Sequence, residues 1–184
     1  MQTFLKCPAQ FSYRYVDKIY KKDESIEAFM GKRVHESIDY FSRKKKTGVL
    51  VSYDQLIDYY SKLWSHKWHG KIAIVTKRIL PVDSDKQMTL WQKYASFYYR
   101  IGESCLSRFY KMEKKSQYSI YASEHKIQFL IGNIKIIGVA DRIDVDDDNN
   151  WTIIDYKTGK RKISQKEADE DMQLGLYHAG LDNG

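Results

Sequence analysis

Two aspartates and a lysine in the last third of the chain have the types and spacing of a hydrolytic metal site. Asp155 and Lys157 are two residues apart in strand-like sequence, so their side chains project to the same face. Asp141 lies toward the end of the preceding strand-like segment, one short turn away. Carboxylates on paired strands can converge on one hard cation, and a lysine beside it can position water or neutralise a phosphate oxygen. A plain same-face ion pair, worth about 0.5 kcal/mol if exposed, is the simpler alternative for Asp155 and Lys157, but it leaves Asp141 unexplained.

Three strands are needed to position these side chains. Sequence rich in β-formers runs over residues 118–131, and Gly132-Asn133 is typical of a hairpin turn. Two further strands are expected over residues 134–145 and 151–156, joined by a turn that contains Asp146 to Asn150. The two candidate aspartates would then lie on neighbouring strands.

The first half of the chain has helical periodicity instead. Apolar residues recur at spacings of three and four through residues 26–46, with Met30, Val34 and Ile38 on one face. Ser52 with Gln55, and Ser164 with Glu167, resemble capping boxes that begin helices. The expected helical ranges are 8–16, 26–46, 56–64, 90–112 and 164–179. The polar stretch with Pro81, Asp83 and Asp85 is expected to be a loop.

This order of elements predicts one α/β domain over residues 1–184. Residues 1–116 form its mainly helical part, and residues 117–184 form a strand core with a following helix. A length of 184 residues allows one ordinary domain and hardly a second.

Charge is unevenly distributed along the chain. The net charge is +7, but residues 1–140 hold 25 basic and 13 acidic side chains, whereas residues 141–184 hold 6 and 11. The basic part is accompanied by many of the fifteen tyrosines. Basic and aromatic residues together suit single-stranded nucleic acid, whose bases stack on rings and whose phosphates attract cations. An aromatic core under a solvated basic face is the alternative.

Composition excludes several classes of protein. Hydrophobic residues at 42% and charged residues at 30% are typical of a globular protein, not of a disordered or fibrous one. No apolar run is long enough to span a bilayer or to act as a secretion signal. Cys7 and Cys105 cannot build a disulfide framework. We therefore expect a soluble, cytoplasmic protein with no membrane partner.

Four motifs in order resemble one known family. They are Gly31-Lys-Arg-Val-His35, Gly138-Val-Ala-Asp141-Arg-Ile-Asp144, Asp155-Tyr-Lys157-Thr-Gly159 and Gln173-Leu-Gly-Leu-Tyr177, preceded by an N-terminal segment from Cys7 to Tyr15. This set resembles the RecB-like branch of the PD-(D/E)xK nuclease superfamily, which includes CRISPR-associated adaptation exonucleases and RecB/AddB nuclease domains. The resemblance implies a restriction-endonuclease-like α/β core, with a small mixed sheet flanked by helices and preceded by a helical region.

The resemblance also implies roles for individual residues. The metal ligands would be His35, Asp141, Asp155 and the backbone carbonyl of Tyr156, and the ion would be Mg²⁺ or Mn²⁺. The catalytic set would comprise the two aspartates with Lys157, Gln173 and Tyr177. Gln173 and Tyr177 are four residues apart, on one helix face, and would support the site or the DNA strand. Glu124 could reach the same cluster, and Arg142 could pair with a carboxylate or a phosphate.

Other metal motifs are weaker. Some members of this branch bind an iron–sulfur cluster through four cysteines, but this chain has only Cys7 and Cys105, so no cluster is expected in it. Asp144, Asp146 and Asp148 imitate the start of a calcium-binding EF-hand loop, although Asn149 replaces its glycine and strands flank it. His66 and His69 have metal-like spacing without a second ligand pair. The closing helices of the family would be missing or very short after residue 184.

The sequence thus predicts a divalent-metal-dependent deoxyribonuclease that hydrolyses phosphodiester bonds, with an exonuclease on single strands or DNA ends as the expected form. Its partners would be DNA and a protein of a repair, recombination or CRISPR complex. The rival hypothesis is a nucleic-acid-binding module that is inactive alone or needs a partner. Neither a glycine-rich phosphate loop nor a nucleophile elbow is present in the sequence.

Overall fold

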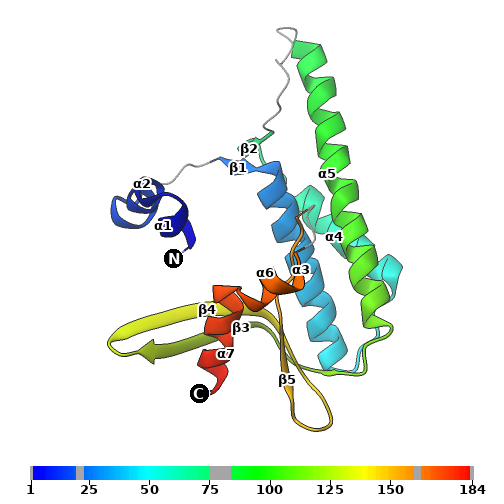
Figure 1. The fold of residues 1–184 in the computed structure, drawn as a ribbon. Coiled ribbons are helices and arrows are strands. Elements are labelled where there is room, and N and C mark those ends of the chain that lie inside the picture. The colour runs from blue at the N-terminus through cyan, green and yellow to red at the C-terminus, as the bar shows by residue number, and fades with distance from the viewer. Residues whose placement is uncertain (1, 20–22, 75–83, 160–162, 183–184) are drawn as a thin grey trace.

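A computed structural model describes residues 2–19, 23–74, 84–159 and 163–182. Its element order confirms a mixed α/β fold in which helices precede a small sheet (Figure 1). In that figure the sheet extends away from the long helices as a hairpin, with α7 beside it.

Three helices form the first hydrophobic core. They are α3 (Ile26–Lys46), α4 (Tyr53–Lys67) and α5 (Ser84–Glu113). The apolar spacing of α3 places Met30, Val34, Ile38 and Phe41 on its buried face, as the sequence predicts. Ser25 caps α3 by accepting a hydrogen bond from the N–H of Ala28.

The capping box at Ser52 and Gln55 is formed in full, which fixes the start of α4. Helix α3 ends at Lys46, just before Gly48, whose φ of +79° suits glycine. Asp85, expected in a loop, is instead in the first turn of α5, where a carboxylate suits the helix dipole. Pro81 and Asp83 are outside the described residues.

The N-terminal segment is helical in short pieces. After α1 (Gln2–Lys6), the helix expected over residues 8–16 divides into α2 (Pro8–Phe11) and the π-helical turn η1 (Ser12–Val16). Cys7 is exposed at the start of α2, where its Sγ accepts a hydrogen bond from the N–H of Gln10.

In the described parts of the chain, the strands form two separate sheets. The short strands β1 (Glu24–Ser25) and β2 (Ile72–Ala73) pair in parallel beside the helices, and the sequence did not predict them. The larger sheet has the order β3-β4-β5 and is antiparallel. Parallel and antiparallel pairings are therefore both present, but in different sheets.

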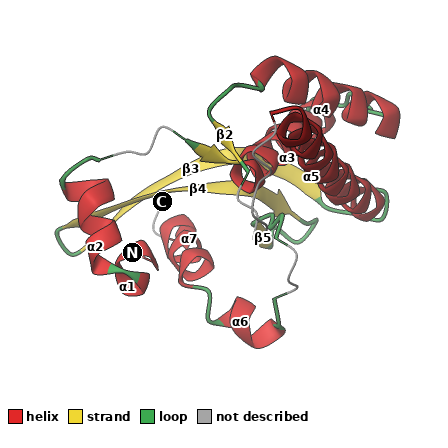
Figure 2. Cartoon of the chain, turned by 90° about the horizontal axis from the view of Figure 1, so that it is seen from above, coloured by secondary structure: helices red, strands yellow, loops and turns green. Residues whose placement is uncertain are grey.

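The three-stranded sheet is built from β3 (Ser119–Ile131), β4 (Ile134–Val145) and β5 (Trp151–Ile154). Gly132, with φ of +57°, allows the tight turn that pairs Ile131 with Ile134. Strand β5 ends at Ile154, two residues earlier than expected. Figure 2 shows the hairpin of β3 and β4 reaching past α7, away from α3, α4 and α5.

The single helix expected over residues 164–179 is wrong. Two helices, α6 (Gln165–Asp169) and α7 (Met172–Asp182), replace it. The capping box at Ser164 and Glu167 begins α6 as predicted. A new helix then begins after Asp171, whose carboxylate accepts hydrogen bonds from the N–H groups of Gln173 and Leu174.

Helix α7 covers the sheet and forms a second core, in which buried Tyr177 packs with Ile127, Ala140 and Ile143. Within the part of the chain that the structure describes, no helix is both long enough and apolar enough to cross a bilayer.

Candidate metal centre and its lysine

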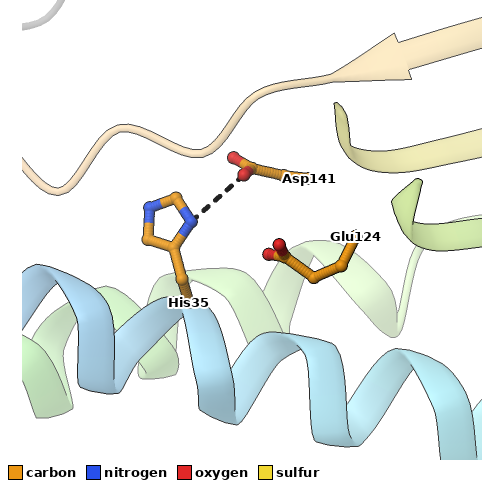
Figure 3. A group of neighbouring side chains, drawn as sticks. All are labelled: His35, Glu124 and Asp141. Atoms are coloured by element: carbon orange, nitrogen blue, oxygen red, sulfur yellow. Dashed lines mark hydrogen bonds and ion pairs between the residues drawn. The ribbon is translucent and has the colours of Figure 1, made fainter. Parts of the chain in front are cut away.

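Three side chains from three elements converge between α3 and the sheet (Figure 3). His35 projects from α3, Asp141 from β4 and Glu124 from β3, and their ligand atoms all lie within 4.8 Å of one another. His35 Nδ1 is 3.2 Å from Asp141 Oδ1. Ligands of one hard cation lie within about 4–5 Å of one another, so these three atoms are close enough to bind a single ion. One imidazole nitrogen with two carboxylates is a donor set that fits such an ion.

Hairpin geometry brings Glu124 to this group. Counting back equally from the Ile131–Ile134 pair places Glu124 opposite Asp141, where facing side chains are neighbours. The regular ladder pairs Ser123 with Arg142 and His125 with Ala140. Glu124 itself has φ of +49°, a left-handed conformation that costs a non-glycine residue about 1–2 kcal/mol. Such strain is typical of functional positions.

A second cluster lies directly beyond β5. Lys157 and Asp155 form an ion pair, and Gln173 Nε2 donates to Asp155 Oδ1 at 3.1 Å. The same amide donates to the hydroxyl of Tyr177 at 2.9 Å. Gln173 thus links Asp155 to Tyr177, which lies on the same face of α7, as the spacing of four residues predicts.

The backbone of Tyr156 joins the two clusters. Its N–H donates to Asp141 Oδ2 at 2.7 Å, and its ring packs edge-on against His35 and Phe109. Asp155 is not part of the group formed by His35, Glu124 and Asp141 within the described residues. Its role as a metal ligand, and that of the Tyr156 carbonyl, stay predictions.

Close packing of α3 on the segment that contains Lys157 explains Gly31, the glycine of the motif that ends at His35. A Cβ at Gly31 would come 3.1 Å from Thr158 Oγ1, which is tighter than ordinary contact. Glycine at this position therefore lets the segment after β5 approach the helix that bears His35.

Gly138 is required by the buried ring of Tyr177. A Cβ at Gly138 would overlap that ring, whereas a Cβ at Gly175 on α7 would meet nothing within 4 Å. We expect Gly138→Ala to lower the free energy of unfolding by about 1–3 kcal/mol, measured by urea denaturation. Gly175→Ala is the matched control and should raise it by up to about 1 kcal/mol, because alanine favours a helix. Equal effects of the two variants would contradict this assignment.

Local electrostatics set the protonation of the cluster. The hydrogen bond to Asp141 raises the pKa of His35, despite the opposing effect of burial. Burial and the nearby Asp141 raise the pKa of Glu124. Burial acts to lower the pKa of Lys157, but the contact with Asp155 outweighs it and the pKa is raised. Lys157 is therefore an ammonium at neutral pH.

The raised pKa of His35 gives a pH dependence whose sign changes with metal. Without metal, protonated His35 stabilises the fold, and this stabilisation is present in full below its ordinary pKa of 6.5. It is lost as the pH rises through the raised pKa of His35 in the fold. A cation needs the neutral imidazole, so binding should strengthen over the same pH increase. The thermal unfolding temperature should fall between pH 5.5 and 8.5 in EDTA and rise over the same range in Mn²⁺, so the two slopes against pH have opposite signs. His35→Gln should remove both, and persistence of either slope in that variant would contradict the assignment.

An open cavity of about 490 Å³ leads to the metal group. Besides His35, Glu124 and Asp141, it is lined by Gly31, Lys32, Glu36 and Asp39. The sequence did not indicate Lys32, Glu36 or Asp39 as site residues. Asp39 is one helical turn after His35, and this i,i+4 spacing was the signal that could have indicated it.

Arg142 is a structural residue in this molecule. It is 1% exposed, donates to both oxygens of Asp144 at 2.5 and 2.7 Å, and donates to Glu113 at 2.6 Å. Of the two expected partners, carboxylate and phosphate, the structure shows the carboxylates. Lys45 also contacts Glu113, at 2.8 Å, so a network connects α3, α5 and β4.

The remaining metal motifs take other forms. Asp144 is buried with Arg142, and Asp146 accepts hydrogen bonds from the N–H groups of Asp148 and Asn150, as in a tight turn. The metal-compatible group within the described ranges does not include His66 or His69. His69 instead lies 3.5 Å from Glu24.

Comparison with known proteins identifies the class of this fold and site. Residues 1–184 match the family model of the PD-(D/E)XK nuclease superfamily, and the chain belongs to that superfamily, whose members use divalent metals.

Two curated relatives are larger proteins. An uncharacterized protein of Rickettsia typhi is 29% identical over 86% of this chain and 18% of its own length. An uncharacterized protein of Rickettsia conorii is 24% identical over 96% of this chain and 20% of its own length. The chain thus spans about a fifth of the length of these relatives.

Proposed function

We propose that this chain is a divalent-metal-dependent deoxyribonuclease of the RecB-like branch, acting as an exonuclease on single strands or DNA ends. The observation that carries the proposal is the convergence of His35, Glu124 and Asp141 beside the Lys157–Asp155 pair, in a member of a nuclease superfamily. The proposed ion is Mg²⁺ or Mn²⁺, which would polarise the phosphate and activate water.

Residues of the chain itself have distinct proposed roles in this reaction. His35, Asp141 and Glu124 would hold the ion, and Asp155 would join them or position Lys157. Because Lys157 is protonated at neutral pH, it would orient water or neutralise a phosphate oxygen; proton abstraction by its amine is disfavoured. Gln173 would keep Asp155 in place, supported by the hydroxyl of Tyr177.

The same contacts support a single nuclease domain over residues 1–184. The candidate metal group takes His35 from the helical core and Asp141 from the sheet. A site of this kind would fail if the two cores separated. The larger size of the two relatives is compatible with such a domain working within a longer protein or complex of repair, recombination or CRISPR adaptation.

Cleavage of internally labelled single strands tests the proposal. Purified protein would be incubated with linear and circular single-stranded DNA in Mg²⁺, Mn²⁺ or EDTA. Metal-dependent cutting of the linear form alone is the expected result. Cutting of both forms would indicate an endonuclease, and a mobility shift without cutting would favour the rival binding module.

Lys157→Gln tests the proposed cationic role. Loss of the ammonium should lower the cleavage rate by about 100-fold while Mn²⁺ affinity changes little, since Lys157 is not a proposed ligand. The rate in Mn²⁺ and the Mn²⁺ dissociation constant by calorimetry give the two readouts. Lys166→Gln, at an exposed position on α6, is the control. A rate within a few-fold of the parent would exclude a catalytic role for Lys157.

A further inference from the structure

Two exposed aromatic side chains contact each other at the start of the sheet. Tyr121 on β3 and Trp151 on β5 have ring centroids 4.5 Å apart, yet they are 43% and 48% exposed. Neither ring belongs to the two hydrophobic cores formed by the described residues. Core packing therefore does not account for this aromatic pair.

A basic helix end lies against the aromatic pair. Lys46 Nζ donates to the backbone oxygen of Tyr121 at 2.5 Å and lies 5.7 Å from the centre of its ring. Lys46 closes the run from Arg43 to Lys46 at the end of α3. Exposed rings beside exposed cations are the combination that binds bases and phosphates of single-stranded nucleic acid.

The aromatic pair is connected to the candidate metal centre along two elements. Along α3, the distance from His35 to Lys46 is about 16 Å at the rise per residue of an α-helix. Strand β3 runs from Glu124 to Tyr121, and between them Ser123 donates to Asp39 at 2.5 Å. Both elements therefore lead from the site to the same exposed surface.

We propose that Tyr121, Trp151 and Lys46 form a stacking platform for the unpaired bases of the DNA strand that enters the site. This inference rests on the proposed nuclease function and adds to it the residues that would bind the unpaired strand. Paired bases in a duplex have no free face to offer such rings, so the platform selects single-stranded DNA. Asp146 to Asp148 lie in the turn just before Trp151, and their negative charge would repel phosphates there. The platform would therefore form the end of the DNA-binding surface that lies farther from the metal centre.

Binding to normal and abasic strands tests the platform. The probes would be an oligothymidylate of about twelve nucleotides and an abasic strand of the same length, with affinity measured by fluorescence anisotropy in EDTA. Trp151→Leu and Tyr121→Leu should each weaken binding of the normal strand by about 5- to 150-fold, the value of one stacked base, and leave the abasic strand unchanged. Phe97→Leu, which alters an aromatic of similar exposure on α5, is the matched control and should bind both like the parent.

Lys46→Gln gives an independent readout. Loss of one phosphate contact should weaken both strands and reduce the slope of log affinity against log salt by about 0.7. Equal effects of Trp151→Leu on the two probes, or no effect on either, would overturn the platform. So would a change in self-association by sedimentation, which would identify a contact between copies. A parent protein that neither binds nor cuts single strands would instead refute the proposed function itself.

Discussion

Asp141→Asn is expected to abolish metal-dependent cleavage, lowering the rate by about 1,000-fold or more. Asp141 receives the His35 imidazole on one oxygen and the N–H of Tyr156 on the other, and it faces Glu124 across the hairpin. Asparagine can still accept from Tyr156, so the fold should survive. The lost negative charge removes the central member of the proposed ligand set, and an ion's contribution to the transition state is worth several kcal/mol.

Three measurements on this variant separate catalysis from folding. The cleavage rate should fall and the Mn²⁺ dissociation constant should rise, while the circular dichroism spectrum and the affinity for DNA in EDTA stay near those of the parent. Asp54→Asn replaces an exposed aspartate on α4 and should behave like the parent in every assay. A variant that still binds Mn²⁺ and cuts at a comparable rate would show that Asp141 is not a ligand.

Arg142→Met is expected to cause the largest loss of stability, about 3–5 kcal/mol in free energy of unfolding. The guanidinium holds the buried carboxylate of Asp144 by two hydrogen bonds and that of Glu113 by a third. These contacts raise the pKa of Arg142 against the effect of burial. Methionine fills a similar volume but leaves Asp144 charged and unpaired at 1% exposure, which is the costly case.

Urea denaturation at neutral pH would measure this loss. Arg43→Met is the matched control, because Arg43 is 67% exposed and its ion pair with Asp39 should contribute less than about 1 kcal/mol. The double variant Arg142→Met with Asp144→Leu should recover part of the stability, since no charge is then left unpaired. A loss below about 1 kcal/mol for the single variant would mean that water reaches this network.

Local rules explain which elements could be predicted from the sequence. The bounds of α3 and β4 follow from apolar periodicity and from turn residues such as Gly132, which act over a few residues. The break between α6 and α7 was missed because Asp171 restarts the helix by capping it, and a single aspartate inside a helical pattern is a weak signal.

The position of Glu124 in the site could be predicted only in part from the sequence. The two-residue turn at Gly132-Asn133 fixes the hairpin register and so places Glu124 opposite Asp141. The left-handed backbone of Glu124, however, departs from the ladder and had no sequence signal. Similarly, the motif containing Arg142 does not say whether that side chain meets a phosphate or a buried carboxylate.

The sequence by itself predicted α3, α4, α5, the hairpin and the candidate residues, because those depend on periodicity, capping and motif spacing. Only the tertiary structure decided which candidates share one centre. The distance between His35 and Asp141 depends on how α3 packs against the sheet, and that packing brings together residues far apart in sequence, such as Asp39 with Ser123 and His35 with Tyr156. The same packing brings Glu124 to that centre and places Asp155 with Lys157 and Gln173.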